Sequence, residues 1–192
     1  MMATYGMLDN IKDHSVMVAR IAEFLARGLR SGGCDIPLDL TISGALLHDI
    51  GKTFCLNNGC NHALKGKEIC LEHGFEQVAV LVEEHVILGQ AFPELPISAK
   101  EVVYYADKRV NHDQIVSLQQ RLDYIIERYG DNDQHRIKLI RINFQRCIAI
   151  EKEIFSYLDL QPDDLAAQVE AMNGEVWDFF QQETQPANHQ TL

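Results

Sequence analysis

Apolar residues recur at spacings of three and four along most of this chain, and this constrains the fold more than any other feature. Such spacing is typical of one buried face of an α-helix. The first stretch runs from Leu8 to Leu29, and the pattern returns at 78–85, 118–129 and 135–158. The alternation expected of half-buried strands is almost absent. The sequence therefore predicts an all-α fold built as a helical bundle.

Glycine and proline mark the breaks between the first helices. "SGGCDIP" ends the first helix, and Pro37 is placed to open a second that stops near Gly51. "KTFCLNNG" reads as a loop, and a third helix is expected from His62 to His73.

The second half of the chain is divided in the same way. After the break "AFPELP", Ser98 and Glu101 have the spacing of a capping box at the start of a helix. Pro162 is expected to start a last amphipathic helix, which runs through Trp177 and Phe180.

The length and charge of the chain limit what it can bind. Its 192 residues suit one domain with a proper core. The formal net charge of -11 disfavours long nucleic acids, because the chain lacks the cationic field that such polymers need. No apolar run approaches the roughly 20 residues of a membrane span. Five cysteines without a regular disulfide framework, and no signal peptide, indicate a reducing cytoplasm.

Several helices place a metal-capable side chain where an apolar one would suffice. These residues are His14, His48, Asp49, His62, His85 and Asp107. Burying so many polar groups without partners would cost several kcal/mol. A shared cation would remove that cost, since imidazole nitrogens and carboxylate oxygens are ligands for Zn, Mn, Fe, Ni or Co. A single inward histidine is more simply a hydrogen-bonded core residue, but six such positions favour ligation.

The order of these residues along the chain is similar to that of a known protein superfamily. Over about residues 8 to 130, the chain resembles the HD-domain metal-dependent phosphohydrolase superfamily. The resemblance rests on His14, then His48 and Asp49 within "HDIGK", then Asp107 within "YYADK". The pair in "NHD" at 112–113 is a decoy. The resemblance implies that these four residues hold a divalent metal inside a helical bundle.

The same resemblance implies how the rest of the chain is used. His62 and His85 stand where some branches of the superfamily have ligands of a second ion. The HD domain would occupy residues 1–130. Residues 131–192 would form a C-terminal helical extension packed on the same domain, frayed from about 183.

The expected activity is that of a small stand-alone HDIG-type phosphohydrolase. Asp49 would bridge two ions, and a metal-activated hydroxide would cleave a phosphomonoester, phosphodiester or phosphoanhydride bond of a small nucleotide-like substrate. Lys52 would stabilise charge on the phosphoryl group, and Lys108 and Arg109 would bind phosphate. Each of these cations also has a simpler interpretation as a solvated lysine or arginine near a helix end.

Two other interpretations remain open from the sequence. One is a non-catalytic HD module that acts as a sensor or scaffold. The other is a structural zinc site made by Cys55, Cys60, His62 and Cys70, although their spacing fits no tight knuckle, and free thiols near the pocket wall are simpler. The C-terminal helices could cover the bundle, shape the pocket entrance or form the face of a homodimer.

Overall fold

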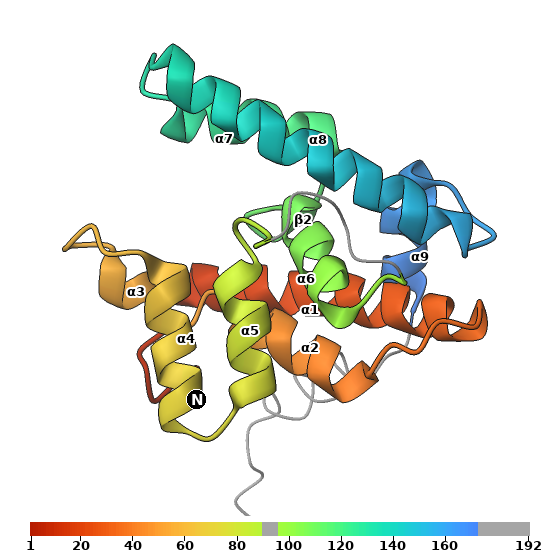
Figure 1. The fold of residues 1–192 in the computed structure, drawn as a ribbon, viewed down its shortest axis with the longest axis horizontal. Helices are drawn as coiled ribbons and strands as arrows, with labels where there is room; N and C mark the ends of the chain where they lie inside the picture. The colour runs from red at the N-terminus through yellow and green to blue at the C-terminus, as the bar shows by residue number, and fades with distance from the viewer. Residues whose placement is uncertain (90–95, 173–192) are drawn as a thin grey trace, which may run out of the picture.

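The structure is a computed structural model that describes residues 1–89 and 96–172 (Figure 1). Its elements, in chain order, are α1 (Asp9–Ser31), α2 (Leu38–Leu47), α3 (Lys52–Cys55), α4 (His62–Glu72), α5 (Glu76–Glu84), α6 (Ala99–Lys108), β1 (Val110–Asn111), β2 (Gln114–Ile115), α7 (Leu118–Tyr129), α8 (Gln134–Ser156), the 3-10 turn η1 (Pro162–Asp164) and α9 (Leu165–Ala171).

Helices make up nearly all the regular structure in the described residues, which confirms the all-α class. The exception is a short antiparallel hairpin, in which Val110 pairs with Ile115 and Asn111 with Gln114. Strands of two residues are too short to show an alternating pattern in a sequence. None of the described helices is both long enough and apolar enough to cross a membrane.

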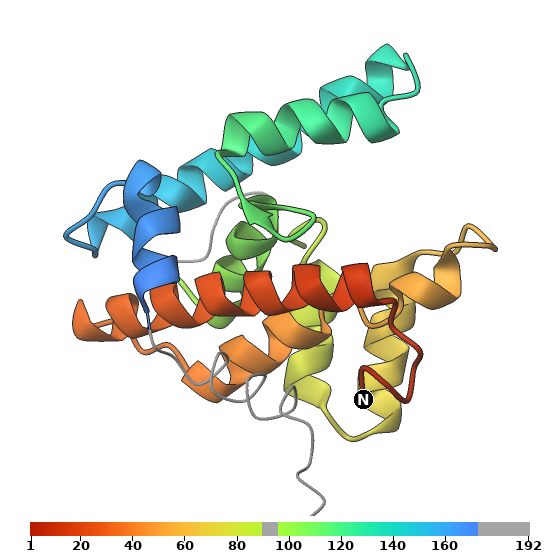
Figure 2. The ribbon, with the colours of Figure 1, turned by 180° about the vertical axis from the view of Figure 1, so that it is seen from behind.

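The long helix α1, red in Figure 2, runs across the middle of that view. It packs against α2 and α6, and α9 lies against it as well. The helices α4 and α5 form one hairpin, and α5 joins this hairpin to α2 and α6. The helices α7 and α8 form a second hairpin, which lies across the top of the view in Figure 1 and contacts the bundle through α6.

Two apolar clusters hold this arrangement together. The larger one surrounds the inward face of α1, where Ile21 and Leu25 are fully buried, and includes Tyr104 of α6. The smaller one joins Ile11 of α1 to Ile69 of α4. Burying an apolar side chain of this size contributes about 1.5–3 kcal/mol. The inward face predicted for the first helix is therefore confirmed.

The end of α2 differs from the expectation, because the helix stops at Leu47 and a turn leads to Gly51. A Cβ atom at Gly51 would lie 2.5 Å from the carbonyl oxygen of His62 and 2.6 Å from the amide nitrogen of Gly66. Only glycine permits this approach. The bare backbone at Gly51 thus brings the start of α4 against the end of α2.

Two other boundaries also differ from the sequence analysis. Residues 52–55, expected in a loop, form the single-turn helix α3. The last predicted helix begins at Pro162 as expected, through η1, and α9 ends at Ala171. Trp177, Phe180 and the tail from about 183 lie outside the described residues.

We predict that Ser98→Ala lowers the free energy of unfolding by about 1 kcal/mol. Ser98 and Glu101 form the expected capping box at the start of α6, so the change leaves backbone N–H groups of the first turn without an acceptor. Urea unfolding measures the loss. Ser156→Ala, at an exposed position of α8, is the control and should change stability by less than about 0.5 kcal/mol. Equal effects of the two substitutions would contradict the capping role.

Candidate metal centre

Five helices meet where the sequence analysis expected a metal site. The structure brings all six predicted ligands together, from α1, the ends of α2 and α5, the start of α4, and α6: His14, His48, Asp49, His62, His85 and Asp107. His62 is about one-third exposed, and the other five side chains are buried. The cluster therefore lies at the edge of the core, with His62 toward solvent.

Three of the histidines are oriented by backbone carbonyl groups. The Nδ1 atoms of His48 and His85 each lie 2.6 Å from the carbonyl oxygen three residues earlier, at Ala45 and Val82. A carbonyl oxygen can only accept, so Nδ1 must donate and the lone pair is left on Nε2. His14 follows the same rule, since its Nδ1 donates over 2.8 Å to the carbonyl oxygen of His112. Three Nε2 atoms are thereby prepared as metal ligands.

The decoy pair at 112–113 contributes to the site in an unexpected way. His112 occupies the turn between β1 and β2 with a positive φ of 55°. Its backbone carbonyl, rather than its ring, orients His14. The backbone of His112 therefore orients a candidate ligand, while its ring does not belong to either group of ligand atoms.

The ligand atoms form two groups that share Asp49. Those of His14, His48 and Asp49 lie within 4.8 Å of one another, and so do those of Asp49, His62 and His85. Oδ2 of Asp49 lies 3.5 Å from Nε2 of His48, while Oδ1 lies 3.4 Å from Nε2 of His62. Each carboxylate oxygen thus faces a different group.

Asp107 completes the first group. Its Oδ1 lies 3.1 Å from Nε2 of His14 and 3.8 Å from Nε2 of His48. The first group can therefore offer four ligands, and the second offers three. His48 and Asp49 are neighbours in the chain, and the turn after α2 directs both side chains into one cluster.

An unsatisfied buried nitrogen and a close pair of ring nitrogens show that the cluster fits a cation. Nε2 of His48 is fully buried and has no hydrogen-bond partner in the described structure. Nε2 of His62 and Nε2 of His85 lie 3.2 Å apart, so either one ring donates a hydrogen bond to the other or both lone pairs face a shared positive charge. Burying lone pairs in this way is unfavourable without a donor or a positive charge between them. Divalent ions at these two positions would satisfy each of them.

The pKa shifts of two histidines and of both carboxylates favour ligation, whereas His48 differs: burial opposes its protonation, but Asp49 and Asp107 outweigh burial and raise its pKa. Burial lowers the pKa of His62 to about 4 and also lowers the pKa of His85, so both rings stay neutral at neutral pH. Burial opposes ionisation of Asp49, but the neighbouring His48 and Lys52 hold its pKa well below the ordinary value. Burial likewise opposes ionisation of Asp107, yet the neighbouring Lys108 holds its pKa well below the ordinary value. Neutral imidazoles and ionised carboxylates are the forms that bind metals.

The three predicted cations have different positions. Nζ of Lys52 donates over 2.7 Å to Oδ2 of Asp49 and is one-third exposed in the pocket. Lys108 is buried, and its Nζ donates to Oδ2 of Asp107 over 3.0 Å and to the carbonyl oxygen of His85. Both therefore border the metal ligands.

Arg109 does not reach the cluster. Its guanidinium donates to the carbonyl oxygens of Val116, at 2.7 Å, and Pro162, at 3.0 Å, and to the hydroxyl of Tyr105. Its side chain is buried among these groups and is absent from the residues that line the pocket. The expected phosphate contact is corrected: in this structure Arg109 ties α6 to the segment before α9.

A cavity of about 520 Å³ opens above the cluster, within the usual size for a small-molecule site. It exposes Asp49, His62, His85 and Asp107, and Lys52 and Lys108 line it too. Two further cations that the sequence analysis did not single out line the cavity, Arg121 of α7 and Arg136 of α8. Nη1 of Arg121 donates over 3.0 Å to Oδ1 of Asn111, and its Nη2 lies 3.5 Å from Oδ1 of Asp107. The sequence did contain a signal for Arg121. This residue precedes Ile125 by four residues, so the two side chains lie on the same face of the predicted helix.

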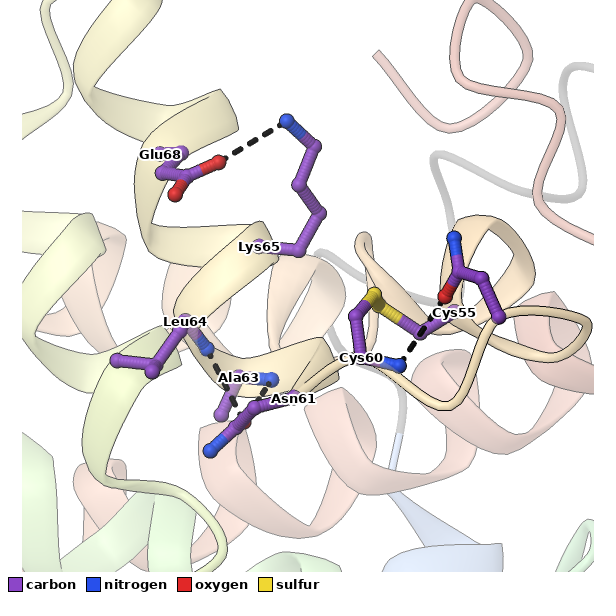
Figure 3. Close-up of a disulfide and its surroundings, with 8 residues drawn as sticks. Cys55, Cys60, Asn61, Ala63, Leu64, Lys65 and Glu68 are labelled. Atoms are coloured by element: carbon purple, nitrogen blue, oxygen red, sulfur yellow. Dashed lines mark hydrogen bonds and ion pairs between the residues drawn. A yellow bond between two sulfur atoms is a disulfide. The ribbon is translucent and has the colours of Figure 1, made fainter.

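The cysteines of this region form a disulfide rather than a zinc site. Cys55 and Cys60 are bonded to each other just before Asn61, whose side chain caps α4 (Figure 3). A sulfur atom in a disulfide cannot serve as a thiolate ligand. Cys70 is a buried free thiol. The expectation of free thiols is thus wrong for Cys55 and Cys60, and the zinc alternative loses two of its four ligands.

We predict that replacing both Cys55 and Cys60 by serine lowers the free energy of unfolding by about 2 kcal/mol, since the bond closes a very short loop. Urea unfolding under oxidising conditions tests this. Wild-type protein treated with a phosphine reductant is the matched control and should unfold like the double variant. Stability that neither treatment changes would show that the bond does not form in solution.

Comparison with known proteins agrees with this geometry. The HD-domain family model matches residues 11–125, which span α1 to most of α7. A relative described as an uncharacterised protein of Methanocaldococcus jannaschii is 28% identical over 148 residues, which cover 70% of this chain and 86% of that protein. No solved structure matches.

Two further relatives are described as tRNA (cytidine(56)-2'-O)-methyltransferases. The one from Picrophilus torridus is 30% identical over 152 residues, covering 71% of this chain and 41% of the relative. The one from Thermoplasma volcanium is 30% identical over 132 residues, covering 62% and 37%. The chain thus spans only about two fifths of the length of these methyltransferases. Because the family match covers more than half of the chain, including every predicted metal ligand, the protein belongs to the HD-domain family.

Proposed function

We propose that the protein is a metal-dependent phosphohydrolase that cleaves a phosphate ester or anhydride bond of a small nucleotide-like substrate. The observation that carries the proposal is the position of Asp49, whose two oxygens face two separate groups of ligands. A bridging carboxylate between two cation positions is the arrangement used for hydrolysis at phosphorus.

The donor set suits one or two divalent transition metals. Imidazole nitrogens with carboxylate oxygens favour Zn, Mn, Fe, Ni or Co over Mg or Ca, which prefer oxygen ligands alone. The first position would be held by His14, His48, Asp49 and Asp107, and the second by Asp49, His62 and His85. Ions bound there would supply Lewis acidity and lower the pKa of water toward neutrality.

The side chains around the cluster have roles that follow from their positions. Lys52 is the cation best placed for the phosphoryl group, because it is partly exposed in the cavity and next to Asp49. Charge that develops on phosphoryl oxygens during hydrolysis would be stabilised there. Lys108 is buried and donates hydrogen bonds to Asp107 and to the carbonyl oxygen of His85. It would therefore hold these residues in place and add positive potential to the cavity floor.

A small substrate fits this chain better than a polymer. The net charge of -11 opposes long-range attraction of a nucleic acid, whereas a cavity of about 520 Å³ with bound cations can still attract a small anion. The tRNA substrate named for two relatives belongs to proteins of which this chain spans a minor part. We therefore propose a free nucleotide or similar phosphate ester.

We predict two divalent ions per chain in protein reconstituted with Mn or Co, as measured by elemental analysis. His62→Ala should lower the content to one ion, because His62 faces only the second group. Asp49→Asn should lower occupancy at both positions. His135→Ala, at an exposed position of α8, should leave the count unchanged. A single ion in the wild type that persists in His62→Ala would contradict the second position.

We predict that Asp49→Asn lowers kcat at least about 100-fold on any nucleotide that the wild type hydrolyses, and that Lys52→Ala lowers it about 10²–10³-fold while keeping the metal. Release of phosphate from a panel of nucleotides, with circular dichroism to confirm folding, measures both effects. Lys12→Ala, on the surface of α1, is the control. A folded, metal-loaded wild type that turns over no phosphate ester would favour a non-catalytic module.

A further inference from the structure

The cavity above the metal cluster has one wall that the reaction itself does not require. It is built by the α7–α8 hairpin, which presents five apolar side chains to the cavity: Ile125, Tyr129, Leu139, Ile140 and Phe144. We call these five residues the apolar strip. None of them is a metal ligand or a cation, so the proposed hydrolysis gives them no role.

The strip leads away from the polar floor of the cavity. On α7, Ile125 and Tyr129 follow Arg121 by four and eight residues, so the three share one face. At 1.5 Å per residue they lie about 6 and 12 Å farther along the helix axis than Arg121. Arg121 is close to Asp107, which fixes the inner end of the strip at the metal ligands.

Large apolar side chains are left exposed at the mouth of this cavity. Tyr129 is 50% and Leu139 is 53% exposed on the strip, and Leu56 and Ile87, which also line the cavity, are 57% and 59% exposed. Apolar surface that gathers around a cavity, instead of being scattered, is typical of a ligand site. The rim is therefore suited to an apolar group whose other end reaches the floor.

Charge separates the two ends of the cavity. Lys52, Lys108 and Arg121 are gathered with the ligands at the floor, and no charged residue belongs to the strip itself. Arg136 lines the outer end, where it is paired with exposed Asp131. A ligand that matches this distribution is anionic at its inner end and apolar beyond it.

We infer that the apolar strip selects substrates by their leaving group, favouring phosphate esters whose organic part is aromatic or otherwise apolar over small polar or short alkyl esters. The inference rests on the proposed function, because the phosphoryl group is what places the organic part against the strip. The occupant is thus the organic part of the substrate, and Leu139 and Ile125 are specificity-determining residues.

The test compares benzyl phosphate with ethyl phosphate, which have leaving groups of similar acidity and differ mainly in apolar size. The wild type should show a kcat/KM at least about tenfold higher for benzyl phosphate, mostly through KM. Leu139→Ser and Ile125→Ser should bring the ratio of the two values toward one. Ile142→Ser is the matched control, since Ile142 is an exposed residue of α8, at 39%, outside the cavity lining.

The outcomes separate this inference from the proposed function. If the wild type turns over both esters equally, or if Ile142→Ser loses the preference as much as the strip variants do, the inference about the apolar strip is wrong. The proposed phosphohydrolase activity is then unaffected. Self-association that Leu139→Ser abolishes and Ile142→Ser does not would also overturn the inference, because the strip would then be an interface between copies.

If neither ester is hydrolysed, the nucleotide panel still decides whether the proposed hydrolase activity exists, and a binding measurement decides whether the apolar strip recognises the organic part of the ligand. Isothermal titration of metal-loaded protein with benzylphosphonate and methylphosphonate, which have no cleavable ester bond, then supplies the measurement. Tighter binding of benzylphosphonate that Leu139→Ser removes supports the strip, and equal binding of the two phosphonates overturns it.

Discussion

The burial of Asp49 between two groups of histidines is the constraint on which the rest of the structure depends. A carboxylate that is almost wholly removed from water is unfavourable unless positive charge surrounds it. The end of α2, the start of α4 and the end of α5 all approach this one group, with Lys52 beside it. The packing of α4 against Gly51 has the same effect, because it sets how far His62 stands from Asp49.

Much of this arrangement could be predicted from the sequence. The spacing of apolar residues gave the helices, and the capping box of Ser98 and Glu101 gave the start of α6 to the residue. The six candidate ligands could be recognised because each interrupts an apolar face of a predicted helix, and the structure places them in one cluster. The spacing of apolar residues and the presence of metal-capable side chains can be recognised within a short stretch of sequence. They can therefore be detected without knowing which parts of the chain meet in the fold.

What the sequence could not provide depends on the direction of side chains and on distant contacts. Lys108 and Arg109 are neighbours in the chain, but adjacent positions on a helix diverge by about 100°, so one borders the metal ligands and the other ties the helix to Pro162. Arg121 reaches Asp107 from another helix, 14 residues away. The bond between Cys55 and Cys60 depends on the fold of the loop between them.

The way in which His48 and His85 are held has a consequence for the choice of metal. Each ring is fastened to the carbonyl group one turn back in its own helix, so its lone pair cannot move unless the end of that helix moves as well. Those helix ends are packed in the core. An ion whose preferred geometry did not match the positions of these two nitrogen atoms would have to break the hydrogen bonds that hold the rings, and it would therefore bind less tightly.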